Sequence, residues 1–480
     1  MNLSAFERKL ETLKLIPHLD VGEVERFGRV VSSLDDWELF RINPLRFADS
    51  HGFALPLLLD LLIHSVKIGL FDFFWSVICP ACGGVEYTYD SINHLKQADV
   101  FCTTCNISVS CDLDEQVEVS FTINPAIQDL SQQVNPFAGM ETYLRYFFSA
   151  NYQRSPALQA FARSHFLGFD MIEPDHSLNL TLQAEAGHHY RLINLQSHSQ
   201  LALYASSEQS PVPTHVETDL LGQGFAQEAL SILAGDVRLA VHNRSHQRMI
   251  ITSWKADFER LRQILNEAPH TRTPFYTAKM LLSNQTFREQ FRIQQLDQDL
   301  KLNIRSLTLL FTDLKGSTEM YERAGDYQAY SLVQQHFNLL AGCVRRNAGS
   351  IVKTMGDAIM ATFTSPLDGA RAAREMLDAL ASLPGSEQLG LKIGLHEGPV
   401  LAVNADERLD YFGQSVNLAA RVQGLAEAGE IWLTETVYQD LKGNCPLRQA
   451  GFAAEARSAQ LKGVSAPARV YRFFKPESAD

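Results

Sequence analysis

The spacing of apolar residues changes along the chain, and each change marks a different kind of segment. Residues 1–70 carry apolar side chains at three- and four-residue spacing, which is typical of amphipathic helices. Within them, residues 41–70 have the pattern of a helix, a glycine turn and a second helix, as in a helix-turn-helix or winged-helix unit. From residue 117 to 254, apolar and polar residues alternate, which predicts strands. Two strand faces are the clearest, Leu178, Leu180 and Leu182, and Val237, Leu239 and Val241.

Helical spacing returns after the predicted strands. Residues 255–302 place Met280, Phe287 and Phe291 on one stripe of a helix. This stripe predicts a helical linker, either packed on its own domain or paired with a second copy of the chain. From residue 303 to 476, strands and helices are mixed, which is the pattern of an α+β domain.

Composition and charge exclude several classes of protein. The chain has 480 residues, 45% of them hydrophobic and 20% charged, so it is globular and too long for one core. The net charge of −13 and the few basic residues of segment 41–70 argue against nucleic-acid binding. Charges interrupt the most apolar stretch, residues 53–77, too often for a membrane span, and the N-terminus has no apolar signal core. We therefore expect a cytoplasmic protein with no membrane association.

The cysteines indicate a metal site. Five of the seven cysteines lie in one short stretch, and four form two Cys-x-x-C knuckles, Cys79 with Cys82 and Cys102 with Cys105. Nineteen residues separate the knuckles, a spacing that suits four thiolates around one structural Zn²⁺ in a zinc ribbon. The alternative is four unrelated reduced cysteines. Cys111 has no assigned role, although a redox switch is one option.

Two aspartates in the last third are candidates for a catalytic metal site. The stretch "LTLLFTDLKGST" is an apolar strand that ends at Asp313, and "GSIVKTMGDAIMATF" is a hairpin with Asp357 in its Gly-Asp turn. Paired strands would bring the two carboxylates together, and such carboxylates repel unless a cation lies between them. Divalent ions such as Mg²⁺ suit carboxylate and phosphate oxygens and can promote phosphoryl transfer.

A helix predicted to begin near Ser415 supplies a second candidate group. Asn417 and Arg421 are four residues apart and therefore project from the same face. A guanidinium beside an amide can bind a phosphate in its transition state. The alternative is an exposed helix face that contacts only water.

Four motifs in order, "FTDLKGST", "KTMGD", "LDYFGQSVNLAAR" and "LKGV", resemble the class III nucleotidyl cyclase domain. The resemblance implies an α+β, ferredoxin-like domain and a head-to-tail homodimer with active sites at its interface. It implies that Asp313 and Asp357 bind two Mg²⁺ or Mn²⁺ ions, and that the partner contributes Asn417 and Arg421 to the transition state. The remaining residues that match substrate-binding positions are Lys353, Asp410, Lys462, Lys392, Gly316 and Ser317.

The resemblance also implies which base is read. Lys353 would donate to N1 of adenine and Asp410 would accept from its 6-amino group, whereas guanine presents the opposite pattern. Glu or Cys at these positions usually marks a guanylate cyclase. The prediction is therefore an adenylate cyclase that converts ATP to 3′,5′-cyclic AMP and pyrophosphate. The alternatives are a guanylate cyclase and a non-catalytic, nucleotide-responsive binding protein.

The front half resembles an uncharacterised region that precedes cyclase domains in some bacterial proteins, through "NPLRFADSHG" and the segments around both cysteine knuckles. This implies regulation by an unknown ligand or protein. One departure is the stretch "LAVNADERL", which is shorter than in animal-like cyclases and concerns an arm at the dimer edge. The expected domains are a helical, winged-helix-like unit with the zinc ribbon at 1–116, a β-rich regulatory domain at 117–254, the helical linker at 255–302 and the catalytic domain at 303–476.

Overall fold

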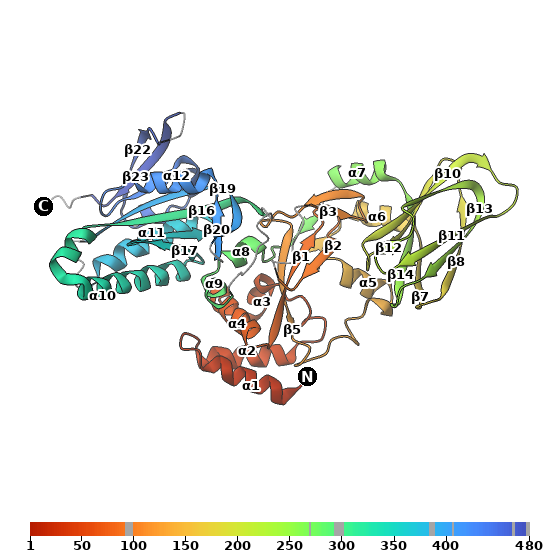
Figure 1. Cartoon of the computed structure of the whole chain (residues 1–480), viewed down its shortest axis with the longest axis horizontal. Coiled ribbons are helices and arrows are strands. Elements are labelled where there is room, and N and C mark those ends of the chain that lie inside the picture. Colours follow the sequence, from red (N-terminus) through yellow and green to blue (C-terminus); the bar gives the residue numbers. More distant parts are fainter. Residues whose placement is uncertain are drawn as a thin grey trace.

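The computed structural model has three lobes in a row, with the N-terminal helices between the β-rich region and the C-terminal α+β region (Figure 1). The structure describes residues 1–91, 99–267, 270–291, 302–383, 389–405, 408–462 and 466–476. Within these ranges, no helix is both long enough and apolar enough to cross a lipid bilayer.

Four helices open the chain, and their ends carry the local signals that start and stop helices. They are α1 (Leu3–Lys14), α2 (Val21–Ser33), α3 (Pro44–His51) and α4 (Leu55–Lys67). Asp20 caps α2 by accepting from the backbone N–H of Glu23, and Asn43 caps α3. Gly52 follows α3 with φ of 66°, a left-handed conformation that glycine adopts without strain. This is the glycine turn predicted between the two helices of segment 41–70.

A small antiparallel sheet follows the helices, in the order β2-β1-β5. Its strands are β1 (Phe71–Ile78), β2 (Val85–Tyr89) and β5 (Val117–Ile123), and a separate hairpin is formed by β3 (Asp99–Cys102) and β4 (Ile107–Ser110). The predicted boundary at 116/117 is wrong, because β5 pairs with β1 from Phe71↔Ile123 to Val77↔Val117. Residues 117–123 therefore belong to the N-terminal unit, which consists of helices α1–α4 and the sheet β2-β1-β5. Their period-two pattern identified a strand but could not identify its partner.

The β-rich region holds one eight-stranded sheet in the order β12-β11-β13-β10-β9-β14-β7, with β8 beside β13. The strands are β7 (Phe166–Ile172), β8 (Ser177–Ala184), β9 (His189–Asn194), β10 (Ser199–Gln209), β11 (Thr214–Leu221), β12 (Gly224–Phe225), β13 (Ala229–Asn243) and β14 (Met249–Ala256). The two predicted strand faces are direct cross-strand partners, because Leu178 pairs with Val241, Leu180 with Leu239 and Leu182 with Val237. These pairs contribute to the core of the region.

Short helices lie between this sheet and the N-terminal unit. They are α5 (Met140–Phe147), α6 (Pro156–His165) and α7 (Phe258–Glu267), with the 3₁₀ turn η2 (Pro136–Ala138) before α5. Two short strands, β6 (Tyr152–Gln153) and β15 (Thr271–Arg272), pair with each other. In Figure 1, α5 and α6 lie where the two lobes meet, with α7 above them.

The predicted helical linker at 255–302 is not one continuous helix. After α7 and β15, the chain forms α8 (Ala278–Leu282) and α9 (Gln285–Gln290), and residues 292–301 lie outside the described residues. Asn284 separates the two helices, because its side chain accepts from the N–H of Phe287 and caps the start of α9. Phe287 of the predicted stripe is nevertheless buried, with its ring centroid 6.0 Å from that of Trp75, and Met280 and Phe291 are half-buried against the same core. Helices α8 and α9 therefore pack on the N-terminal helices and sheet, whereas α7 lies beside α6.

The C-terminal region is an α+β fold built on an eight-stranded sheet in the order β17-β18-β16-β19-β21-β23-β22, with β20 beside β19. The strands are β16 (Leu302–Lys315), β17 (Ser350–Met355), β18 (Ala358–Phe363), β19 (Gly390–Ala405), β20 (Arg408–Phe412), β21 (Ile431–Thr434), β22 (Ala453–Ala459) and β23 (Ala468–Phe474). The helices are α10 (Ser317–Arg346), α11 (Pro366–Ala381), α12 (Gln414–Gln423), α13 (Glu435–Leu441) and α14 (Pro446–Gln449). The expected α+β class is confirmed for this region.

The two faces of this sheet have different partners. Leu310, Ile393 and Leu395 pack with α10, α11 and α13 in one core. Leu309 and Phe311 belong instead to a core that also contains α8, α9 and the N-terminal sheet. Strand alternation assigns neighbouring residues of β16 to these two cores.

Polar contacts reinforce the junction between the N-terminal unit and the C-terminal region. Asp114 accepts hydrogen bonds from the backbone N–H groups of Arg305 at 3.0 Å and Ser306 at 3.2 Å. Arg288 of α9 donates to the carbonyl oxygen of Leu409 at 2.7 Å. The backbone of β16 and the hairpin strand β20 are therefore both bound to segments that precede residue 292.

Truncating Phe287 tests this packing. Phe287 is 2% exposed, so Phe287→Ala leaves a cavity and should destabilise the unit by about 3 kcal/mol. Urea unfolding followed by tryptophan fluorescence should show a lower midpoint, because Trp75 lies in the same cluster. Leu15→Ala is the control, since Leu15 is 80% exposed. Equal midpoints for the two variants would contradict a structural role for α9.

Candidate active site

Two predicted metal-binding aspartates lie at one edge of the C-terminal sheet. β16 pairs with β18 in a register that ends at Phe311↔Met360, and the N–H of Ile359 donates to the Thr312 hydroxyl at 3.0 Å. Continuing this register places Asp313 opposite Ala358, the residue directly after Asp357. Asp357 lies in a two-residue turn with Gly356, whose φ of 64° permits the tight hairpin. The two carboxylates therefore belong to the same end of neighbouring strands.

Lys392 forms an ion pair with Asp313. Lys392 lies opposite Asp313 on β19, and its Nζ is 3.3 Å from Asp313 Oδ2. Both side chains are partly exposed, so the carboxylate remains open to solvent. Such an arrangement can bind a hydrated divalent cation, because carboxylate oxygens are preferred ligands of hard cations.

A second ion pair joins the two residues that were predicted to read the base. Lys353 Nζ of β17 lies 2.6 Å from Asp410 Oδ2 of β20. The other oxygen, Asp410 Oδ1, accepts from the N–H of Tyr411 at 2.8 Å, which orients the carboxylate. The lysine side chain is 40% exposed and the aspartate 19%, so the pair lies at a solvent-facing position. A donor and an acceptor are thus presented side by side, 57 positions apart in sequence.

The helix α12 presents the predicted transition-state residues away from its own sheet. It buries Ser415, Ala419 and Val422 against the strands. Asn417 is exposed and Arg421 partly exposed on the remaining surface. Among the described residues, neither side chain has a recorded hydrogen-bond or ion-pair partner. Both are therefore available to a ligand or to a second copy of the chain.

The predicted phosphate-binding residues lie at two places. Gly316 has φ of 88° and precedes Ser317, the first residue of α10. Backbone N–H groups at a helix N-terminus can bind phosphate oxygens, and here they directly follow the strand that carries Asp313. Lys462 is exposed in a turn beside residues 463–465, which lie outside the described part of the chain. The predicted arm "LAVNADERL" includes residues 406–407, which are also outside it, although Ala405 and Arg408 pair in a hairpin.

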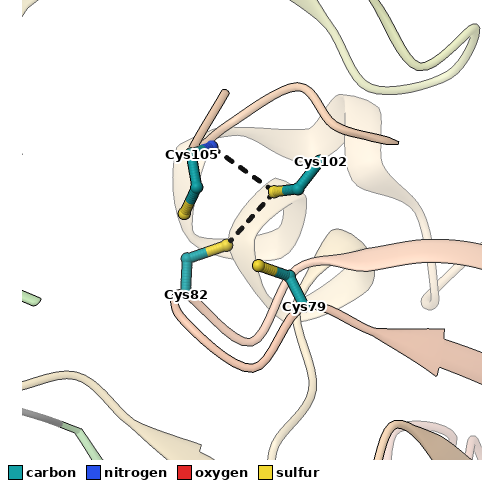
Figure 2. A group of neighbouring side chains, drawn as sticks. All are labelled: Cys79, Cys82, Cys102 and Cys105. Atoms are coloured by element: carbon teal, nitrogen blue, oxygen red, sulfur yellow. Dashed lines mark hydrogen bonds between the residues drawn. The ribbon is translucent and has the colours of Figure 1, made fainter. Parts of the chain in front are cut away.

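The structure brings the four knuckle cysteines together, as Figure 2 shows. Their sulfur atoms lie within 4.8 Å of one another and all four side chains are buried. Cys82 Sγ and Cys102 Sγ are 3.7 Å apart, close to the separation of about 3.8 Å expected for thiolates bound tetrahedrally to zinc. Backbone N–H groups of Gly84 and Cys105 donate to these sulfurs, which stabilises negative charge on them. The cluster could therefore hold one tetrahedral metal ion.

The four thiols share protons unequally, because contacts with the other thiols and burial raise the pKa of Cys102, and burial contributes to a raised pKa of Cys82. Hydrogen bonds from Cys102, Cys105 and Cys82 lower the pKa of the Cys79 thiol, so the cluster favours at least one thiolate. Cys111 stands apart from the cluster and is buried, which raises the pKa of its thiol to about 12. A protonated, buried thiol does not support a redox switch at Cys111.

The sequence of the chain matches two family models. Residues 4–289 match the family of unknown function DUF5939. The chain belongs to this family. Residues 301–472 match the adenylate and guanylate cyclase catalytic domain, so the predicted resemblance is confirmed for this segment. The family models describe the front half only as DUF5939, so its winged-helix and zinc-ribbon character remains a prediction.

Individual relatives agree with the cyclase match. An adenylate cyclase of Mycosarcoma maydis is 32% identical over 184 residues, covering 33% of this chain and 7% of the relative. An adenylate cyclase of Anabaena cylindrica is 27% identical over 188 residues, 35% of this chain and 36% of the relative. The match to the solved adenylyl cyclase CyaB from P. aeruginosa has 24% identity and a TM-score of 0.32, covering 37% of this chain and 98% of that one. The chain thus covers only a small part of the Mycosarcoma maydis relative and about a third of the Anabaena cylindrica relative.

Two buried histidines near the candidate site carry no sequence signal of a role. His336 of α10 is fully buried, and burial lowers its pKa although the charge and backbone of Asp357 raise it. His396 of β19 is buried beside α12 and shares a hydrogen bond of 3.0 Å with the Thr434 hydroxyl. His396 lies within the strand motif "LKIGLHEGPV", but no spacing signalled a role for it. Only the packing of α12 on β19 makes this histidine notable.

The buried state of His396 predicts a pH dependence of stability. Burial lowers its pKa to about 4, below the ordinary value of 6.5, so the folded state binds its proton less tightly than the unfolded state. Its contribution is therefore complete above pH 6.5 and is lost as the pH falls toward 4, by up to about 3 kcal/mol in total. Urea titrations across this range should show a shallower loss of unfolding free energy for His396→Gln than for the parent chain.

The matched control for this prediction is His246→Gln, because His246 is exposed. Its unfolding free energy should follow the parent at every pH. An identical pH slope in His396→Gln and the parent would show that this histidine is not held neutral by the fold.

Proposed function

We propose that the protein is an adenylate cyclase that converts ATP to 3′,5′-cyclic AMP and pyrophosphate. The observation that carries this proposal is the Lys353–Asp410 pair of 2.6 Å, in a segment that is a cyclase catalytic domain. A lysine donor beside a carboxylate acceptor matches the N1 and 6-amino edge of adenine. Guanine presents a carbonyl and an N–H there, and would leave both protein groups wrongly paired.

The aspartates are proposed to hold the metal ions of the reaction. Asp313 and Asp357 would bind two Mg²⁺ or Mn²⁺ ions, which when bound lower the pKa of the ribose 3′-hydroxyl and balance charge on the phosphates. Lys392, which pairs with Asp313 at 3.3 Å, would exchange this partner for a phosphate oxygen. The amides of Gly316 and Ser317, together with Lys462, would orient the triphosphate for in-line attack on the α-phosphorus.

We further propose that the active enzyme is a homodimer. Asn417 and Arg421 project from the exposed surface of α12 and not toward the strands beneath it. In a head-to-tail pair, Asn417 would orient the ribose and Arg421 would stabilise charge on the α-phosphate of the partner's site. The DUF5939 segment would regulate this enzyme, a role supported by its direct contacts with β16 and β20.

The four buried cysteines are proposed to hold one structural Zn²⁺. The support is their mutual distance and their burial. Four protein thiolates complete a tetrahedral site and leave no open position for catalysis. The metal would join the loop after β1 to the β3–β4 hairpin, two short elements with little apolar core of their own.

The cyclase proposal predicts a nucleotide preference that two substitutions change. The purified full chain should form cyclic AMP from ATP with Mg²⁺ or Mn²⁺, and little cyclic GMP from GTP. The double variant Lys353→Glu/Asp410→Cys should lose at least about 100-fold of its activity with ATP and gain relative activity with GTP, because its donor and acceptor are reversed. Chromatographic product analysis measures both reactions.

Controls separate the metal site from the base site. Asp313→Asn should abolish turnover of both nucleotides, because an amide does not replace the metal-binding carboxylate. Asp378→Asn and Lys442→Glu change exposed charges elsewhere in the same region and should leave turnover unchanged. Cyclic GMP as the main product of the parent would overturn the adenylate assignment. Absence of turnover with either nucleotide would favour a nucleotide-binding protein.

The zinc proposal predicts one zinc ion per chain, measured by elemental analysis of the purified protein. Cys82→Ser should lose most of this zinc and unfold at a lower temperature, because metal binding contributes directly to folding. Cys343→Ser is the control, since Cys343 belongs to α10 and lies in the separate core that α10 shares with α11. Equal zinc contents in the two variants would contradict the assignment.

A further inference from the structure

A cavity of about 130 Å³ lies outside the cyclase region, where α5, α6 and α7 meet β14 and the cysteine cluster. Its walls are mainly apolar and aromatic side chains, including Tyr143, Leu158, Phe161, Trp254 and Phe258. Cys82 and Cys105 line the end nearest the cluster. The cavity therefore lies at the junction of the N-terminal unit and the β-rich sheet, and none of its residues belongs to the proposed cyclase machinery.

One wall of the cavity carries a buried cation that lacks a full set of acceptors. Arg191 of β9 is 6% exposed, and its Nη2 donates to the carbonyl oxygen of Thr104 at 3.0 Å. Its Nη1 is buried and has no hydrogen-bond partner within the described residues. The guanidinium lies 4.9 Å from the ring centroid of Phe258. An unpaired donor on a buried cation is unfavourable, so this position favours an added acceptor.

Arg191 remains charged despite its burial. Burial lowers its pKa to about 10, which is still well above neutral pH. Cys105 and Cys102 raise that pKa, so a metal-thiolate cluster would help to balance the charge. The thiolates would balance the charge of Arg191 without accepting a hydrogen bond from its Nη1.

A second arginine lines the same cavity. The Arg154 guanidinium lies 4.2 Å from the ring centroid of Phe148, and both side chains are lining residues. Two other charged lining residues are already engaged, because Lys255 pairs with Glu185 and Asp257 caps the first turn of α7 through the Arg260 N–H. The charged groups that remain unpaired in the cavity are therefore the two arginines, and beside them the neutral Tyr143 hydroxyl is buried without a hydrogen-bond partner among the described residues.

We propose that this cavity is a binding site for a compact organic monocarboxylate with an apolar body, such as a small aromatic acid. The carboxylate accepts from Arg191 Nη1 and lies near Arg154. The apolar body packs among Phe161, Trp254 and Leu158. A cavity of about 150 Å³ is known to hold benzene, so this one fits a single ring or a short branched chain and excludes a long acyl chain.

Calorimetric titration of the full, zinc-loaded chain with benzoate tests the proposal against benzyl alcohol, a neutral molecule of nearly the same shape. Benzoate should bind at least about tenfold more tightly, because only the anion completes the hydrogen bonds of Arg191. Arg191→Met should remove this preference for the anion. Arg163→Met, an exposed arginine on α6, should bind benzoate like the parent.

A second variant guards against misfolding of Arg191→Met. Ala162→Phe adds a ring at a lining position and should exclude benzoate while keeping the zinc content and circular dichroism of the parent. Equal binding of benzoate and benzyl alcohol, or full benzoate binding by Arg191→Met, would overturn the assignment. Absence of binding by benzoate, phenylacetate and isovalerate alike, at concentrations up to about 10 mM, would overturn it too.

Discussion

Strand β16 is the element on which both the candidate active site and its link to the front half depend. It is hydrogen-bonded to β18 on one edge and to β19 on the other, so its position is fixed along both sides. Asp114 binds its backbone at Arg305 and Ser306, whereas Asp313 lies near its other end. At about 3.3 Å per residue, these two positions are roughly 26 Å apart along the strand. The DUF5939 contact and Asp313 therefore lie on the same strand.

The two faces of β16 pack in two different hydrophobic cores. One face packs on α10 and α11 and makes a core that belongs to the cyclase region alone. The other shares its core with α8, α9 and the N-terminal sheet. Since a buried shared core is costly to separate, the front half is a structural part of the catalytic lobe and not a domain on a free tether. The contacts of α9 with β17 and β20 place it beside the strands that carry Lys353 and Asp410.

Two ion pairs of the cyclase region lie at positions that solvent reaches. Lys392 balances Asp313 and Lys353 balances Asp410, each at a position that solvent reaches. By contrast, the cation at the cavity in the front half is buried and lacks an acceptor on Nη1. Surface pairs of this kind contribute little to stability, so they can exchange partners when a ligand arrives. A buried unpaired donor is a much stronger indication of a missing ligand.

The residue pattern by itself determined many of the local elements and the resemblance of the last third to a cyclase domain. Strand alternation located the partners Leu180 and Leu239 on buried faces, and the Gly-Asp turn placed Asp357 at a hairpin tip. Cysteine spacing selected the four residues that the fold brings together. These features depend on residues that are close in sequence, because local backbone geometry allows only a few conformations of a short segment.

Only the tertiary structure decided which distant segments pair. β5 joined β1 and not the β-rich sheet, because a strand's pattern shows which face is buried and not which strand lies beside it. The second half of the predicted linker forms α8 and α9 inside a shared core, because an apolar stripe likewise does not show what it packs against. His396 and Arg191 gained their significance from residues far along the chain, α12 in one case and the walls of a cavity in the other. Burial of a titratable or charged group is a property of the whole fold, and no local spacing encodes it.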